Sequence, residues 1–172
     1  MATLLSFNGV SPVYDASAFL APSATLIGDV SIGAHASVFF GTVVRADRAA
    51  IVIGERSNLQ DNVTVHGDPG SPTIVGAGVS VGHGAILHGC TVEDDCLIGM
   101  GSTVLGGAVV GAGSLVAAGA VVLEGTIIPP RSLVAGVPAK VRRALSDKEV
   151  EALRENARTY LGLSETYRSM IG

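Results

Sequence analysis

The amino-acid sequence predicts a mainly β protein, a parallel β-helix of hexapeptide repeats that ends in one α-helix. The first observation is an aliphatic residue at every sixth position between Val75 and Val134, with one shortened step of five from Leu87 to Val92. The second is a small or short residue four positions after each of these, and often a glycine directly after them. A period of six fits neither a helix nor a simple alternating strand. Such short repeats are typical of a β-helix in which three units close one triangular coil.

The same period continues upstream with two interruptions. Two earlier series of aliphatic residues have a spacing of six: Leu20, Leu26, Ile32, Val38 and Val44, and then Ile53, Leu59 and Val65. The steps Val44–Ile53 and Val65–Val75 are longer, and we expect both to be loops that leave the prism at a corner. The second step contains prolines and glycines within residues 67–72, and turns favour these residue types whereas strands reject them.

The pattern changes after Arg143, and we expect the chain to end in an amphipathic helix from about Asp147 to Tyr167. Ser146 and Glu149 have the spacing of a capping box, in which each side chain accepts a hydrogen bond from the other residue's backbone. Apolar residues follow at helical spacing: Val150, Leu153, Ala157 and Leu161. An isolated helix of this length is marginal in water, so its apolar stripe must cover its own β-helix or a neighbouring protomer. The sequence thus divides into a β-helix over 1–145 and a helical segment over 146–172.

Composition indicates a soluble repeat domain. The net charge of −4 on 172 residues argues against nucleic acid or an anionic membrane as the main partner. Residues 104–123 carry no charge and would pass as a membrane span on hydropathy alone, but they keep the six-residue period without a break. Cys90 and Cys96 have neither a zinc-ribbon nor a disulfide spacing, and Cys96 is expected to pack inward. The N-terminus lacks the pattern of a secretion signal, so we expect a cytoplasmic location.

The repeat register places two histidines in one column. The hexads that contain Arg45, His66 and His88 are separated by three units each, so they fall on one side of the prism in successive coils. Each of these residues directly follows the inward-facing aliphatic residue and therefore points outward. Successive coils are about 4.8 Å apart, the spacing of paired strands. Two imidazoles at that spacing can lean together and bind one metal ion.

A third histidine, His83, lies near the corner of a neighbouring side, and it should not meet the other two within one chain. If protomers pack side by side around a threefold axis, His83 of one protomer can face His66 and His88 of the next. Three imidazoles with an open fourth position form the ligand set of a catalytic zinc. The alternative is that these are ordinary surface histidines. For His35, which has no partner in the register, we expect such a structural role.

Several segments resemble the gamma-class carbonic anhydrase family. They are VRAD at 44–47, GERSNLQD at 54–61, His66, GHGAILHG at 82–89 and VAGVPAK at 134–140. The resemblance covers nearly the whole chain, including the terminal helix. It implies a left-handed β-helix, a homotrimer and zinc at the subunit interfaces, with iron or cobalt as alternative metals. The last segment alone also resembles the wider group of hexapeptide-repeat acyltransferases.

Carried over by position, the resemblance assigns the metal ligands to His66, His83 and His88, with His83 supplied by the adjacent protomer. It assigns Arg45 and Asp47 to an ion pair at the subunit interface. The alternative for that pair is a solvated contact on the protein surface.

The resemblance also assigns a polar shell around the metal to Asn58, Gln60 and Asp61. The register supports part of this independently, because Asp61 precedes His83 by one coil on the same side. Gln60 would then orient the metal-bound water. Tyr160 on the terminal helix corresponds to a position that can line the site, or it is a packing residue.

The activity that the resemblance implies is reversible hydration of carbon dioxide to bicarbonate by metal-bound hydroxide. The sequence departs from active family members in two places. Arg48 follows the Arg-x-Asp motif where they carry a glutamate, and the loop after His66 contains a single acid, Asp68. One alternative is therefore an inactive metal-binding scaffold. Another is an acyl-CoA-dependent acyltransferase in which a histidine acts as general base.

Overall fold

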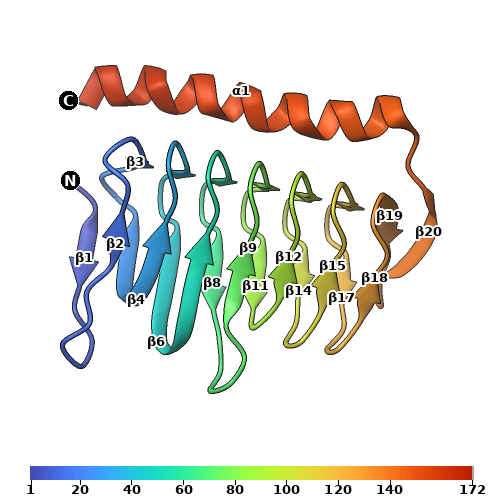
Figure 1. Cartoon of the computed structure of the whole chain (residues 1–172), viewed down its shortest axis with the longest axis horizontal. Helices are drawn as coiled ribbons and strands as arrows, with labels where there is room; N and C mark the ends of the chain where they lie inside the picture. The colour runs from blue at the N-terminus through green and yellow to red at the C-terminus, as the bar shows by residue number, and fades with distance from the viewer. Residues whose placement is uncertain (172) are drawn as a thin grey trace.

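The computed structural model describes residues 1–171 and is a β-solenoid of about seven turns with one helix lying along it (Figure 1). The predicted fold class is confirmed. Gly172, the last residue of the predicted helical segment, lies outside the described residues. Strands of successive coils pair in parallel and stack into three sides.

The three sides are formed by short strands that recur coil after coil. The first side contains β1 (Thr3–Leu5), the first parts of β4 (Thr25–Ile32) and β6 (Val43–Ile53), β8 (Thr64–His66), β11 (Ile86–His88), β14 (Thr103–Val104) and β17 (Val121–Val122). The second side contains β2 (Val13–Tyr14), the last parts of β4 and β6, β9 (Thr73–Val75), β12 (Thr91–Val92), β15 (Val109–Val110) and β18 (Ile127–Ile128). The third side contains β3 (Phe19–Leu20), β5 (Ser37–Val38), β7 (Asn58–Leu59), β10 (Ser80–Val81), β13 (Leu97–Ile98), β16 (Leu115–Val116), β19 (Ser132–Ala135) and the antiparallel β20 (Lys140–Ala144).

The aliphatic residue that opens each hexad points into the core, as predicted. From Leu26 to Val134, none of these residues exposes more than 4% of its surface. Glycines that directly follow them allow neighbouring coils to stack closely. A Cβ atom on Gly82, for example, would lie 2.7 Å from the backbone nitrogen of Met100. Glycine is required there because a side chain has no room between the stacked backbones.

The first predicted loop is wrong. The residues of that longer step stay extended and belong to β6, which runs without a break through the corner between the first and second sides. The extra residues are accommodated by a register shift against β4, in which Ala46 pairs with Gly28 whereas Ile51 pairs with Val30. A bulge of this kind bends a strand without ending it. The spacing of aliphatic residues alone does not distinguish such a bulge from a loop.

The second predicted loop is confirmed, and it lies beside the histidine column. Residues 67–72 connect β8 to β9, and a backbone hydrogen bond from Ser71 to the carbonyl oxygen of Asp68 closes the turn at 2.8 Å. The hydroxyl of Thr73 donates to the carbonyl oxygen of His66 at 2.5 Å, where β8 ends. The loop is therefore held close to β8, with Asp68 next to the strand that carries His66.

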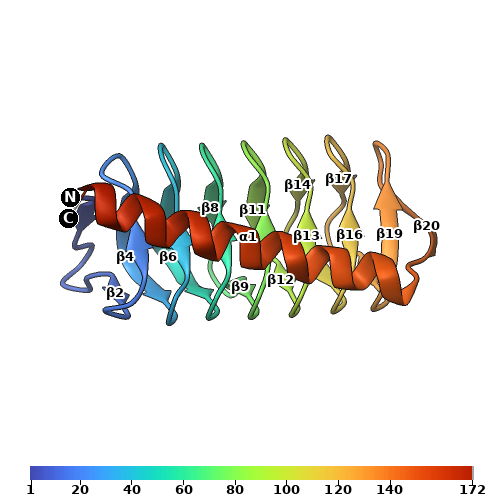
Figure 2. The same cartoon turned by 90° about the horizontal axis from the view of Figure 1, so that it is seen from above.

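Helix α1 (Asp147–Ile171) begins where the sequence predicts and continues past the predicted end at Tyr167. Ser146 and Glu149 form the expected capping box, with the N–H of Glu149 donating to Ser146 Oγ and the N–H of Ser146 donating to the Glu149 carboxylate. Buried residues Val150 and Leu153 pack against leucines of the third side, namely Leu97, Leu115 and Leu133. The helix thus covers its own β-helix, and it runs back over the coils from the last toward the first (Figures 1 and 2).

The uncharged segment 104–123 is part of the solenoid. It contains β15, β16 and β17, which pair with strands of the neighbouring coils. Within residues 1–171, no helix combines the length and the apolar character that crossing a bilayer requires.

The capping box should make part of the stability depend on pH. Hydrogen bonds from Arg143 and from Ser146 lower the pKa of Glu149 from its usual 4.5 to about 2. A carboxyl group with a depressed folded-state pKa contributes stability above its unfolded pKa, and this contribution is lost as the pH falls through the folded value. We therefore expect resistance to urea, followed by the helical circular dichroism signal, to decrease between about pH 4.5 and 2 in a way that Glu149→Gln reduces. An identical acid dependence in Glu149→Gln would contradict this role, and Glu165→Gln on the same helix is the matched control.

Candidate metal centre

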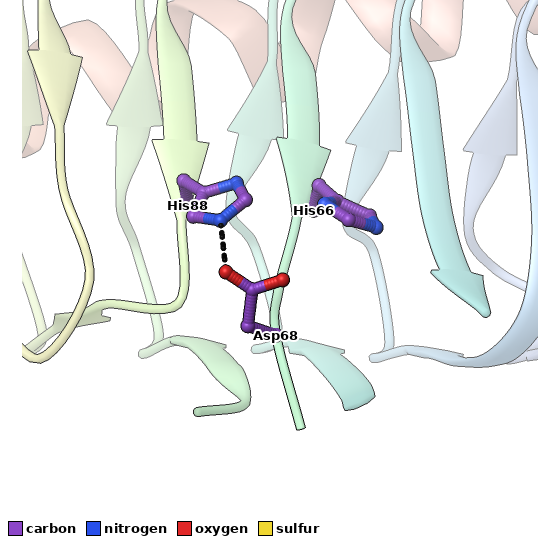
Figure 3. A group of neighbouring side chains, drawn as sticks. All are labelled: His66, Asp68 and His88. Carbon is purple, nitrogen blue, oxygen red and sulfur yellow. Dashed lines mark hydrogen bonds and ion pairs between the residues drawn. The ribbon is translucent and has the colours of Figure 1, made fainter. Parts of the chain in front are cut away.

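The predicted histidine column is present on the first side of the solenoid. Strands β8 and β11 pair in register, so that His88 lies directly opposite His66, with ring centroids 5.1 Å apart. One coil earlier, Val44 pairs with Val65, and Arg45 is therefore the neighbour of His66 in the column. Figure 3 shows the two imidazoles side by side on adjacent strands. The hexad period thus brings together two imidazole side chains that are 22 positions apart in the sequence.

Each imidazole of the pair contacts a carboxylate. His66 Nε2 lies 2.9 Å from Asp47 Oδ1, and the other oxygen of Asp47 accepts a hydrogen bond of 2.6 Å from Arg45. His88 Nε2 lies 3.0 Å from Asp68 Oδ2. The histidine contact is the largest cause that lowers the pKa of each of the two aspartates. An ionised carboxylate only accepts hydrogen bonds, so Nε2 carries the proton and Nδ1 of a neutral ring keeps its lone pair for a metal.

Within the single chain, the ligand atoms that converge are those of His66, Asp68 and His88, all within 4.8 Å of one another (Figure 3). Two imidazole nitrogens and a carboxylate oxygen suit zinc, iron or cobalt. Asp68 stands on the exposed loop, whereas both histidines are half-buried. The residues present therefore fit a divalent metal, and the two histidines on the paired strands would be its best-ordered ligands.

His83 lies elsewhere, as the register predicts. It follows β10 on the third side, and among residues 1–171 the converging ligand group does not include it. Its Nδ1 is 3.0 Å from Asp61 Oδ2, and its Nε2 is 3.2 Å from the hydroxyl of Tyr160. The pairing of Val81 with Leu59 places Asp61 one coil before His83, as expected. The aspartate fixes the ring so that Nε2 is the nitrogen able to bind a metal.

Asn58 and Gln60 lie behind His83 as a buried pair. The side-chain oxygen of Gln60 accepts a hydrogen bond of 3.2 Å from the backbone N–H of His83. The Gln60 amide nitrogen donates to Asn58 Oδ1 at 3.2 Å, and Asn58 Nδ2 donates to Ser80 Oγ at 2.9 Å. The predicted polar residues are therefore grouped around His83, apart from the His66 and His88 pair.

Tyr160 reaches the site region from helix α1. Its ring packs edge-on against Phe39, with centroids 5.5 Å apart, while its hydroxyl contacts His83. Burial, followed by the negative charge of Asp61, raises the pKa of Tyr160. The ring therefore packs against the core, as one of the two alternatives predicts, and the hydroxyl contacts His83.

The two cysteines and His35 lie apart from the cluster. Cys90 and Cys96 are buried in the solenoid, and desolvation raises the pKa of each thiol to about 12, which keeps it protonated and a poor metal ligand. His35 occupies a corner with a positive φ of 56°, and its backbone N–H donates to Ser17 Oγ at 2.8 Å. These contacts belong to the structure of the coil corner.

Two relatives decide the family. A protein of Methanocaldococcus jannaschii named "Probable carbonic anhydrase" is 55% identical over 150 residues, which cover 87% of this chain and 94% of that protein. The Arabidopsis thaliana protein "Gamma carbonic anhydrase 2, mitochondrial" is 42% identical over 97% of this chain and 62% of its own length. The chain belongs to the gamma-class carbonic anhydrase family. His66, His83 and His88 all lie in the segments whose sequence resembles that family.

Two further comparisons concern the fold that this gamma carbonic anhydrase family member shares with other proteins. A family profile described as "Bacterial transferase hexapeptide (six repeats)" matches residues 89–124. The crystal structure of a hexapeptide transferase family protein from Anaplasma phagocytophilum aligns with a TM-score of 0.93 and 42% identity, over 96% of this chain and 98% of that one. The solenoid is therefore common to proteins of both names, and the chemistry must be argued from the site.

Sequence reasoning identified Asp68 only as the single acid of its loop and missed its contacts. In the structure of this gamma carbonic anhydrase family member, Asp68 binds His88 and also lies 3.6 Å from the guanidinium of Arg48. The signal was available, since Asp68 stands only two positions after His66 in the sequence. Arg48, noted as a departure from active relatives, thus holds the acid beside the histidine pair.

Proposed function

We propose that this protein is a zinc-dependent carbonic anhydrase that interconverts carbon dioxide and bicarbonate at sites shared between the protomers of a homotrimer. The observation that carries the proposal is the in-register pair of His66 and His88, each held by a carboxylate, in a chain of the gamma carbonic anhydrase family. We assign the third ligand to the partner subunit's His83. Iron and cobalt are alternative metals for the same donors, and a cytoplasmic location is part of the proposal.

The chain's own residues hold each imidazole of the site in one orientation. Asp47, Asp61 and Asp68 each fix one imidazole, so that a defined nitrogen of each ring stays available. Zinc held by three imidazoles supplies a Lewis acid that makes hydroxide available near neutral pH. Gln60 and Asn58 are assigned to orienting the reacting water, and Tyr160 to lining the site beside His83.

Removal of the proton from the site is expected to be slow, because the loop provides only one acidic side chain. Asp68, the single acid of the loop, is engaged by Arg48 and His88. A proton carrier must be free to take up and release a proton, and a carboxylate held by two partners is poorly suited to that role. We therefore expect a slow enzyme whose rate increases with added buffer.

The test of the proposal is metal content and stopped-flow hydration of carbon dioxide on the same preparation. We expect about one zinc ion per protomer and hydration above background, lost on chelation and restored by zinc. Activity that persists in metal-free protein would refute the proposal. A zinc-loaded trimer without activity would instead identify the scaffold alternative, in which the metal is structural.

An acyl-CoA-dependent transferase is the second candidate function. It is favoured by the profile match over 89–124 and by the hexapeptide transferase name of the Anaplasma structure. In that case, one of the surface histidines would act as general base toward an acceptor hydroxyl or amine. Calorimetric titration with acetyl-CoA separates the two functions, since a transferase must bind it and the carbonic anhydrase need not.

A further inference from the structure

Ser80 lies at the end of a hydrogen-bonded chain that runs to the backbone of His83. The links are Ser80 Oγ to Asn58 Nδ2 at 2.9 Å, Asn58 Oδ1 to Gln60 Nε2 at 3.2 Å, and Gln60 Oε1 to the N–H of His83 at 3.2 Å. Ser80 and Asn58 are on the adjacent paired strands β10 and β7. The chain thus links two neighbouring coils directly behind a candidate metal ligand.

The orientation of the two side-chain amides in this hydrogen-bonded chain is fixed by the backbone N–H of His83. A backbone N–H can only donate, so the carbonyl end of the Gln60 amide must face it. The nitrogen end of Gln60 then faces Asn58, which must present its oxygen and turn its own nitrogen away. That nitrogen requires an acceptor, and the Ser80 hydroxyl supplies it. Reversing either amide would place two donors or two acceptors against each other.

The hydrogen-bonded chain is buried, so the loss of its last acceptor, the Ser80 hydroxyl, should be costly. Ser80 exposes none of its surface, and Asn58 exposes 1%. With the hydroxyl removed, the Asn58 nitrogen would be left without an acceptor in a site closed to bulk solvent, and a buried unpaired donor is costly. Relief would come from rotation of the Asn58 amide, which forces Gln60 to rotate and breaks its bond to His83.

We propose that Ser80 is a positioning residue that sets the orientation of the Asn58 and Gln60 amides and thereby anchors the turn carrying His83. Ser80 itself touches neither substrate nor metal. The inference rests on the proposed function insofar as Gln60 and His83 serve the site. Its structural part, the coupling of Ser80 to the His83 backbone, stands independently of the reaction.

The test compares Ser80→Ala, Ser80→Cys and Ser80→Thr in the full-length zinc-loaded protein. We expect the His83 amide proton of Ser80→Ala to exchange about tenfold faster than in the wild type, because it loses its acceptor. The Gly84 amide, which donates to the Asp61 carbonyl oxygen at 2.9 Å, is the internal reference and should not change. Ser80→Thr retains a hydroxyl and should restore protection, and Ser80→Cys, a weaker acceptor, should be intermediate.

The kinetic measurement separates positioning from a general loss of stability. We expect Ser80→Ala to lower kcat for hydration about tenfold with KM and zinc content unchanged. Ser102→Ala is the matched control, since Ser102 is equally buried and, among residues 1–171, its hydroxyl bonds only to the carbonyl oxygen of Gly99. Unchanged His83 exchange in Ser80→Ala, or the same changes in Ser102→Ala, would overturn the inference. If the wild type lacks hydration activity, the proposed function fails, while the exchange experiment still decides the role of Ser80.

Discussion

Replacing His66 with alanine is expected to remove zinc from the site and to reduce carbon dioxide hydration at least about 1,000-fold, because the metal supplies several kcal/mol of transition-state stabilisation. His66 is half-buried and points out of the solenoid, and its backbone remains in the β8 ladder. The fold should therefore survive, although the loss of a metal that binds only the folded protein should lower the melting temperature. Metal analysis and stopped-flow hydration on the purified variant measure both effects.

The matched control is His35, the histidine that lies away from the column. His35→Asn is preferable to alanine because residue 35 has a positive φ of 56°, a conformation that asparagine tolerates. We expect this variant to keep its zinc and its activity. Comparable losses in both variants would show that the effect of His66→Ala is not specific to the site. A His66→Ala protein that retains full zinc and activity would exclude His66 as a ligand.

The sequence predicts the histidine column because the hexad period gives the side and the coil on which each residue lies. Each aliphatic residue that packs inward fixes the phase of its coil, so the residue after it must point outward at a known level. Counting hexads is therefore sufficient to stack Arg45, His66 and His88 on one side. The same counting places Asp61 one coil before His83, and the contact of 3.0 Å between their side chains agrees with it.

The period does not predict the path of the backbone where the period is interrupted. The extra residues before Ile53 form a bulge in β6 where we expected a loop, because extended backbone can absorb them. Strands β1 and β2 precede the first recognisable hexad and were not predicted. Leu4 and Tyr14 pair with the openers Leu26 and Ile32 of the next coil. Tyr14 stands six positions before Leu20 but is aromatic, and ten positions separate it from Leu4, so the series of aliphatic residues does not reveal this coil.

Long-range contacts of single side chains were also beyond the sequence. The hydroxyl of Tyr160 meets His83 across 77 positions, and that contact depends on how helix α1 lies over the third side. The capping box predicts where the helix begins, and its apolar stripe predicts that it packs, but neither gives the direction in which it crosses the coils. The hydrogen bonds that link Ser80 to His83 likewise cannot be predicted from the sequence, because they depend on the rotamers of the Asn58 and Gln60 amides.

A mixture of two inactive variants is expected to regain activity if the site is shared between protomers. His83→Ala keeps the His66 and His88 pair but lacks the ligand given to a neighbour, and His88→Ala keeps that ligand but lacks the pair. In trimers formed at random from equal amounts of both, one interface in four joins a chain with an intact pair to a chain with an intact His83. Co-expression should therefore restore about a quarter of the wild-type activity and zinc content.

The control for this experiment is a mixture of two variants that both lack a member of the histidine pair. His66→Ala and His88→Ala both damage the pair, so every interface in their mixed trimers lacks one ligand, and no activity should return. If neither mixture recovers activity, the third ligand does not come from a neighbouring protomer. Asp68 would then be the better candidate, since it already lies with His66 and His88 within one chain. Recovery in the first mixture alone requires that His83 act across the interface, because each variant chain by itself lacks a ligand.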